Sequence, residues 1–316
     1  MSAGIISRYK SWIGKHESLI KDLRHSAYLF RKSLVAMIGL VIIVFVVAIA
    51  IVAPWISIQH PTYQSVQTDQ GTMRTEERWD INFNESLQPP NSKHPFGTDD
   101  YGHDLYSMIV YGSRTSLRIG LMVVGITMLI GISLGGIAGY MGRGIDEIIM
   151  RITDVFLAIP SLILAMAVAS ALGRSIDNIM YAMIVVWWPG YARLMRGQVL
   201  SIRENQYIEA ARSVGSGSLR IIYKHILPNA LAPLLVNVSL DLGGVILTAA
   251  GLSFLGLGAS PGTAEWGLLI STGRNHIFHA WWYPTFPGIA ILLTALGFNL
   301  LGDGLGDVLD PRLRRR

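Results

Sequence analysis

The sequence contains no cysteine among its 316 residues, which excludes disulfide bonds, thiolate nucleophiles and cysteine-ligated metal sites. Charged residues make up only 15% of the chain, well below the roughly one quarter that is usual in a soluble globular protein. Apolar residues make up 51%, and the mean hydropathy is +0.42. This balance indicates a protein that lies largely in a lipid bilayer.

Motifs for nucleotide hydrolysis and for side-chain catalysis are also missing. A phosphate-binding loop has the pattern Gly-x4-Gly-Lys-Ser/Thr, and the run Gly14-Lys15-His16 lacks both the upstream glycine and the hydroxyl. No Ser/His/Asp arrangement, metal-binding histidine pair or embedded carboxylate pair stands out. The sequence therefore predicts that this chain is not an enzyme and that it carries no cofactor or metal of its own.

Long apolar runs predict an all-α, polytopic membrane protein with about six transmembrane helices. About twenty apolar residues are needed to cross the hydrocarbon core. The predicted spans are 34–53, 117–140, 148–172, 176–192, 231–255 and 281–301. The first is predicted to be retained, because the polar segment before it is too long for the leader of a signal peptide.

The remaining segments are polar or basic. Residues 1–33 form a basic N-terminal segment, and residues 54–116 are predicted to lie outside the membrane with little regular structure. A five-helix core is predicted over 117–310, with a polar loop at 191–230 and a basic tail at 311–316.

The distribution of lysine and arginine predicts the orientation. Nineteen of the 26 basic residues lie on the side that would hold both termini and the 191–230 loop, six lie on the other side, and Arg118 lies at a boundary. Basic residues are enriched in cytoplasmic loops, so we predict cytoplasmic N- and C-termini. The same distribution explains the basic composition without nucleic acid.

The polar loop at 191–230 has an unusually regular pattern. Residues 209–212 are good helix formers, and Gly215 and Gly217 predict a bend because glycine adopts positive φ at no steric cost. A second helix is predicted over 219–226, ended by Pro228. A helix–bend–helix between two membrane spans indicates a surface that docks another protein.

Polar residues within the predicted spans are candidates for the transport pathway, because polar groups are costly in the membrane. Asn237 and Asp241 are four residues apart and therefore share one helix face. With Ser239 and Asn299, they either face a water-filled pathway or a partner subunit, or they form hydrogen bonds between helices.

Two further patterns have structural interpretations. Gly131, Gly135 and Gly139 follow a small-residue spacing that lets another helix approach closely. The run from His94 to Asp104 is rich in histidine and aspartate, but its His-x8-His spacing fits no usual zinc pattern, and such runs more often form turns. No metal site is predicted there.

The polar loop resembles the signature loop of ABC importer membrane subunits, Glu-Ala-Ala-x3-Gly-x9-Ile-x-Leu-Pro. His225 stands in the Ile position, with Ile226 one place later. The matching residues, which the resemblance implies couple to an ATPase, are Glu209, Ala210, Ala211, Gly215, Leu227 and Pro228.

A second run is similar to the C-type permease subunit of the dipeptide/oligopeptide permease family. It comprises Phe96-Gly-Thr-Asp-Asp-Tyr-Gly-x-Asp104, with His103 where that family usually has arginine, followed by Tyr111-Gly-x-Arg114. The likeness continues through Gly251–Gly258 and Phe298–Arg312 and covers about residues 34–313.

These resemblances imply a type I ABC importer permease in a prokaryotic cell membrane. The expected partners are a homologous second permease subunit, two cytoplasmic ATPase subunits that bind ATP and Mg, and an extracytoplasmic binding protein. The implied cargo is a dipeptide or oligopeptide. Alternatives are the same architecture carrying oligosaccharides, glutathione or nickel, and, more distantly, an ion-coupled secondary transporter.

Overall fold

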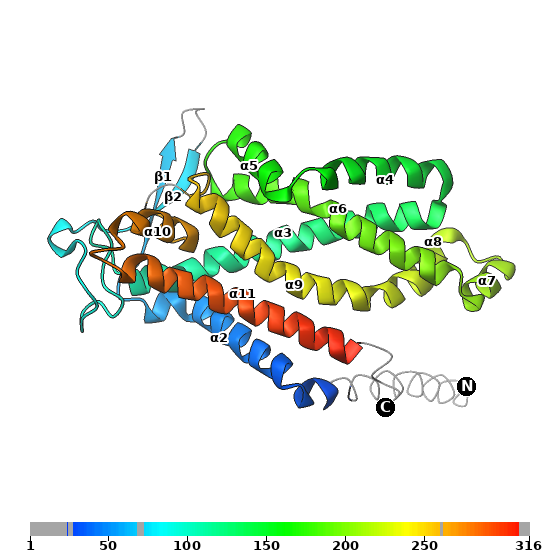
Figure 1. Cartoon of the computed structure of the whole chain (residues 1–316), viewed down its shortest axis with the longest axis horizontal. Coiled ribbons are helices and arrows are strands. Elements are labelled where there is room, and N and C mark those ends of the chain that lie inside the picture. The colour runs from blue at the N-terminus through cyan, green and yellow to red at the C-terminus, as the bar shows by residue number, and fades with distance from the viewer. Residues whose placement is uncertain (1–23, 25–27, 68–72, 260–261, 310–316) are drawn as a thin grey trace, which may run out of the picture.

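The computed structural model describes residues 24, 28–67, 73–259 and 262–309. These residues form an elongated helical bundle with a β-hairpin and loops at one end (Figure 1). The predicted tail 311–316 and most of the basic segment 1–33 lie outside the described residues.

Long helices dominate the bundle. They are α2 (Leu34–Ile56), α3 (Leu105–Met141), α4 (Arg143–Ala158), α5 (Ser161–Leu172), α6 (Ile176–Arg203), α9 (Leu227–Phe254) and α11 (Trp282–Leu309). The shorter elements are β1 (Thr62–Gln67), β2 (Met73–Arg78), η1 (Phe83–Glu85), α7 (Gln206–Ser213), α8 (Ser218–Ile221), the π-helical η2 (Ile222–Ile226), α10 (Trp266–Gly273) and η3 (Arg274–His276).

Four described helices are long and apolar enough to cross a membrane, namely α2, α3, most of α9 and most of α11. The pair α4 and α5 supplies a fifth crossing if the two are counted together. Helix α6 has 28 residues, about 42 Å at 1.5 Å per residue. It is long enough to cross but less apolar, because it carries Asp177 near its start and three arginines near its end.

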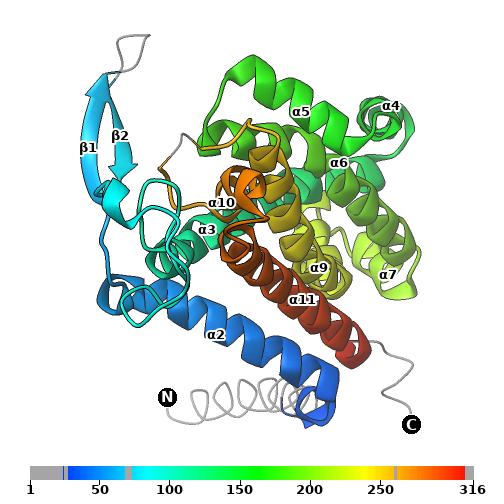
Figure 2. The same cartoon turned by 60° about the vertical axis from the view of Figure 1, so that its left-hand side comes forward.

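The helices run back and forth along the long axis of the bundle. The start of α2 and the end of α11 lie at the same end as α7 and α8, while the β-hairpin and α10 lie at the opposite end (Figures 1 and 2). Because the first and the last long helix begin and end at the same end of the bundle, the chain would cross the membrane an even number of times.

Closely packed glycines hold α3 against α6, as predicted. A Cβ atom added at Gly131 would lie 2.2 Å from the Tyr191 Cβ, and one added at Gly135 would lie 2.2 Å from the Ala192 carbonyl oxygen. At Gly139 the added atom would lie 2.8 Å from the Val199 Cβ. Glycine is therefore required for this approach. A similar contact joins α2 to α11, where Gly304 faces Ala36.

The second membrane helix begins twelve residues before its predicted first residue. The side chain of Asp104 accepts a hydrogen bond from the Ser107 backbone N–H and caps α3 at Leu105. The preceding polar segment also contains more regular structure than predicted, because β1 and β2 form an antiparallel hairpin in which Thr62 pairs with Arg78.

The predicted span over 148–172 is broken in the middle. Helices α4 and α5 meet at a 90° bend. Ile159 has an extended backbone, with φ −96° and ψ 132°, as expected for a residue that precedes proline. Pro160 lacks the N–H that would continue the helix, so the chain turns there.

Candidate functional site

The predicted helix over residues 209–212 forms part of α7, at the end of the bundle opposite the β-hairpin. Gly215 follows α7 with φ +79°, in the left-handed region that favours glycine. The Gly215 N–H donates to the Arg212 carbonyl at 2.9 Å, and the Ser216 N–H donates to the Ala211 carbonyl at 3.1 Å. These two bonds close the C-terminal end of α7 in a tight turn, so the predicted bend is confirmed.

The predicted second helix does not end at Pro228. Instead, α8 continues through the π-helical η2 into α9, which begins at Leu227. Pro228 lies at the start of α9, directly after the π-helical turn in which the Leu227 N–H donates to the Ile222 carbonyl. The loop is therefore joined directly to a membrane helix.

Contacts with α3 and α6 anchor the loop from its inner side. Ile208 of α7 is fully buried, and the Arg212 guanidinium lies 5.5 Å from the centre of the Tyr140 ring. Just before α7, the Arg203 Nη1 donates to the Gly139 carbonyl oxygen at 2.9 Å. The backbone of the loop is therefore held against the bundle.

The outer side of the loop is exposed. Glu209 and Ala210 face solvent on α7, Val214 is 81% exposed, and Tyr223 is 68% exposed. We refer to these residues, together with the half-exposed Tyr207, as the α7 surface. It combines a carboxylate with exposed apolar and aromatic groups, which suits it to docking another protein rather than to chemistry.

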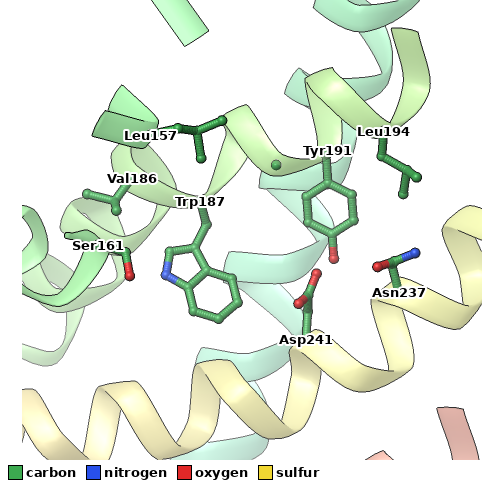
Figure 3. Close-up of a pocket in the computed structure, with 9 residues that line it drawn as sticks. Leu157, Ser161, Val186, Trp187, Tyr191, Leu194, Asn237 and Asp241 are labelled. Atoms are coloured by element: carbon green, nitrogen blue, oxygen red, sulfur yellow. The ribbon is translucent and has the colours of Figure 1, made fainter. Parts of the chain in front are cut away.

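Helices α6 and α9 line a partly open cavity of about 310 Å³. Figure 3 shows the side chains of Trp187 and Tyr191 from α6 facing those of Asn237 and Asp241 from α9. The other lining residues are Leu157, Ser161, Val186, Gly190 and Leu194. Leu157 and Ser161 lie on either side of the α4–α5 bend, so the bend forms part of the wall.

The structure thus brings together two of the four predicted pathway residues. Asn237 and Asp241 both line the cavity, but Asn299 on α11 does not and is exposed. Ser239 is buried, and its hydroxyl donates to the Leu235 carbonyl at 3.2 Å. Asn299 and Ser239 therefore do not line this cavity.

Sequence reasoning missed the two aromatic residues that line the cavity, Trp187 and Tyr191. The predicted span 176–192 would put Trp187 near its end, but α6 extends to Arg203 and places Trp187 near the middle of the helix. The signal was present in the sequence, because Trp187 and Tyr191 are four residues apart and share a helix face with each other.

Two ion pairs fix α6 to α4 near the α7 end of the bundle. The Arg196 Nε and Nη2 donate to the two Asp146 carboxylate oxygens at 2.5 and 2.7 Å. Arg193 pairs with Asp154. The Arg151 Nη2 lies 3.6 Å from a Glu147 carboxylate oxygen on the same helix. A bidentate Arg–carboxylate contact restrains orientation as well as distance.

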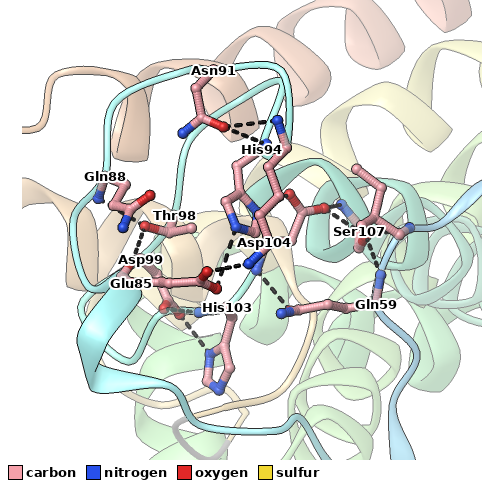
Figure 4. Close-up of polar contacts among 12 residues, drawn as sticks. Gln59, Glu85, Gln88, Asn91, His94, Thr98, Asp99, His103, Asp104 and Ser107 are labelled. Atoms are coloured by element: carbon pink, nitrogen blue, oxygen red, sulfur yellow. Dashed lines mark hydrogen bonds and ion pairs between the residues drawn. The ribbon is translucent and has the colours of Figure 1, made fainter.

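The His94–Asp104 run folds into a buried polar network at the β-hairpin end (Figure 4). The Asp104 carboxylate lies 2.9 Å from the His94 Nδ1 and accepts from the Ser107 hydroxyl at 2.6 Å. The Asp99 carboxylate lies 2.7 Å from the His103 Nδ1. Among the described residues, no three histidine or acidic side chains converge on a point that would hold a metal. The network links loops to the start of α3.

Two glutamates at this end illustrate opposite electrostatic environments. The hydrogen bond from Lys93 lowers the pKa of the partly exposed Glu85. Burial raises the pKa of Glu265, which caps α10 by accepting from the Gly267 and Leu268 N–H groups at 2.9 and 2.7 Å. Neither group faces the cavity between α6 and α9.

Comparison with protein families gives two matches. Residues 131–315 match the model of the binding-protein-dependent transport system inner membrane component. Residues 23–90 match the N-terminal transmembrane domain of oligopeptide transport permease C. The first match includes α6, α7 and α9, and therefore both the α7 surface and the cavity.

Similar curated proteins are named as permeases. The chain is 46% identical over 272 residues to a probable D,D-dipeptide transport system permease protein of Escherichia coli strain K12, covering 86% of each chain. It is 44% identical to a dipeptide transport system permease protein of Alkalihalophilus pseudofirmus, covering 90% of this chain and 88% of the relative. A solved methionine ABC transporter structure aligns with a TM-score of 0.47 at 20% identity, covering 64% of this chain and 96% of that chain.

Proposed function

Because this chain belongs to the family of binding-protein-dependent transport system inner membrane components, we propose that it is a membrane-spanning permease subunit of an ABC importer for peptides. The peptide cargo is supported by the names of its relatives, which include dipeptide and di/tripeptide permeases. The same evidence favours peptides over the oligosaccharides, glutathione or nickel that related importers carry. The family description also supports a location in a prokaryotic cell membrane.

The α7 surface is the proposed coupling element, and it carries the argument for function. Its backbone is anchored by the buried Ile208 and by Arg203, while Glu209 and Val214 face outward. An element held rigidly on one side and exposed on the other can transmit a displacement to the helices on which it is built. Its partners would be two ATPase subunits that bind ATP and Mg, since this chain has no phosphate-binding loop.

A second permease subunit and a binding protein complete the proposed assembly. Among the described residues, basic side chains gather on α4, on the second half of α6 and between α7 and α9, at the end that carries the α7 surface. This supports a cytoplasmic location for that end and, with the basic terminal segments of the sequence, for both termini. The β-hairpin end then faces the binding protein. Closure of the ATPases would draw the two coupling loops together and open the pathway toward the loaded binding protein.

The test uses the full transporter in proteoliposomes, with peptide uptake and ATP hydrolysis measured together. Glu209→Lys reverses the charge on the α7 surface, and a charge-assisted hydrogen bond is worth on the order of 1.5–3 kcal/mol before solvent screening reduces it. We expect loss of uptake and loss of the stimulation of ATPase activity by loaded binding protein. Glu204→Lys is the matched control, because Glu204 is also exposed but lies before α7.

A second pair of variants tests whether the backbone conformation of the bend is needed for transport. Neither Gly215 nor Gly217 has an atom within 4 Å of an added Cβ, but only Gly215 has positive φ. Gly215→Val should therefore abolish uptake, whereas Gly217→Val should retain most of it. If Gly215→Val transports peptide at the wild-type rate, the loop is not the coupling element.

A further inference from the structure

Asp241 is an acidic residue at a position where an unpaired charge would be energetically unfavourable. It lies in the middle of α9, within the part of the helix that is apolar enough to cross a membrane. Acidic side chains in such segments are usually paired or face a water-filled cavity. Asp241 belongs to none of the ion pairs found among the described residues, and its carboxylate faces the cavity between α6 and α9 (Figure 3).

Two buried polar groups from α6 accompany this carboxylate. Tyr191 is only 3% exposed, and its hydroxyl points toward the Asp241 carboxylate. The indole Nε1 of Trp187 is buried without a hydrogen-bond partner among the described residues. Buried polar groups are normally satisfied by hydrogen bonds, so this N–H indicates that water or a ligand atom occupies the cavity beside it.

Asn237 adds a hydrogen-bond acceptor to the cavity. The Asn237 Nδ2 donates to the Pro233 carbonyl oxygen at 3.0 Å, and its amide oxygen faces Tyr191 and Asp241 in Figure 3. The cavity therefore offers a carboxylate, an amide oxygen and a hydroxyl oxygen beside two aromatic rings. Such acceptors and ring faces recognise a cation, and a protonated amine in particular.

We infer that Trp187, Tyr191, Asn237 and Asp241 form a subsite for the protonated amino group of the transported molecule. The inference rests on the proposed function, because only a transport pathway brings cargo to this depth. The volume of about 310 Å³ lies at the lower end of small-molecule sites, which hold about 300–1,000 Å³. It suits the amino end of a short peptide rather than a whole longer one.

The absence of cysteine allows a direct test in the assembled transporter. Ser161 lines the same cavity as Asp241, on the other side of Trp187 (Figure 3), so Ser161→Cys places one thiol of this chain in that cavity. The transporter is reconstituted in nanodiscs without binding protein. The rate of modification by a cationic methanethiosulfonate is compared with that by a neutral one, each normalised to a free thiol.

The expected rate ratio is about ten-fold in favour of the cationic reagent, equivalent to about 1.4 kcal/mol of attraction. Adding Asp241→Asn should bring the ratio close to one. Adding Asp303→Asn should leave it unchanged, because Asp303 is an exposed acid on α11 that does not line the cavity. An unchanged ratio in the Asp241→Asn variant would overturn the inference.

Protection by peptides provides a second measurement that leaves Asp241 intact. Alanyl-alaninamide carries one positive charge, and its N-acetyl derivative is neutral. The charged peptide should slow modification of Ser161→Cys, and the acetylated peptide should not. Equal protection by the two would refute an amine subsite, even if the Asp241→Asn complex failed to assemble.

Parallel uptake measurements separate this inference from the proposed function. If the wild-type transporter imports peptides but shows neither charge selectivity nor amine-dependent protection, only the subsite is wrong. If charge selectivity and protection are found but no peptide in a panel is imported, the peptide cargo is wrong and the subsite serves another amine. If Asp241 instead pairs with a basic residue of a partner subunit, the cationic reagent gains no advantage, which also overturns the inference.

Discussion

Replacing Gly135 by alanine should destabilise the protein by forcing α3 and α6 apart. The added Cβ would lie 2.2 Å from the Ala192 carbonyl oxygen and 3.0 Å from the Ala192 Cα. Favourable non-bonded contacts of carbon lie at roughly 3.5–4.0 Å, so the two backbones must separate by about 1 Å. Neither contacting atom belongs to a flexible side chain, and the strain cannot be relieved by a rotamer change.

The size of the effect follows from two opposing contributions. Overpacking of a well-packed interior costs about 1–3 kcal/mol, and separation of α3 from α6 also weakens the contacts around Gly131 and Gly139. Alanine favours the helix over glycine by about 1 kcal/mol in water, which offsets part of this. A net loss of about 2 kcal/mol corresponds to an unfolding temperature lower by about 5 °C.

Gly136→Ala is the matched control, because Gly136 is the neighbouring residue on the same helix. Its added Cβ would have only the Met195 Cε nearby, at 3.8 Å, an ordinary contact. We expect an unchanged or slightly higher unfolding temperature for this variant. Thermal unfolding of the purified protein in detergent, followed by tryptophan fluorescence, measures both. Equal unfolding temperatures for the two variants would show that the close glycine contact does not hold α3 and α6 together.

Three further outcomes are expected. A cysteine at position 65 should react with an impermeant thiol reagent from outside intact cells, and one at position 216 only after permeabilisation; the opposite pattern would invert the orientation. Asp104→Ala should lower the unfolding temperature measurably, because a capping bond worth about 1 kcal/mol is lost and His94 loses its buried partner; an unchanged value would mean that the network at the β-hairpin end does not stabilise α3. The purified chain alone should hydrolyse no ATP in a phosphate-release assay, and turnover free of contaminating ATPases would contradict the assignment of hydrolysis to separate subunits.

Local sequence was sufficient to predict the loop and the glycine packing. The helix around Glu209 and the positive φ at Gly215 depend on the preferences of a few adjacent residues, and both are found in the structure. The spacing of Gly131, Gly135 and Gly139 also identified the helix face that packs most closely. These features could be predicted because they depend on steric rules that act within one or two turns.

The bend and the cavity could not be predicted from hydropathy. Residues 148–172 are apolar enough for a span, but the backbone at Ile159 and Pro160 turns through 90° between two helices. The role of Trp187 depends on how far α6 continues, and the polar end of that helix was assigned to a loop. The mean hydropathy of a sequence window cannot detect the bend or the length of α6. A straight helix that faces lipid and a bent helix that lines a cavity have similar hydropathy.

The lengths of α6 and α9 connect the cavity to the α7 surface. Tyr191 lies twelve residues before the end of α6 at Arg203, about 18 Å along the helix. Asp241 lies fourteen residues after the start of α9 at Leu227, about 21 Å along that helix. The proposed coupling element is thus joined to both polar walls of the cavity by continuous helix.

If α6 and α9 were equally free to move, a force on the α7 surface would displace both helices together. The cavity changes shape only if one of the two helices is held more firmly than the other. The ion pair of Arg196 with Asp146 and the bond from Arg203 to Gly139 tie α6 to α4 and to the end of α3. Helix α9 starts from the π-helical η2, and among the described residues it makes no such ion pair. A force on the α7 surface would therefore displace α9 more readily than α6. Because Asp241 is on α9 and Tyr191 is on α6, this displacement would change the spacing of the two groups that face each other in the cavity.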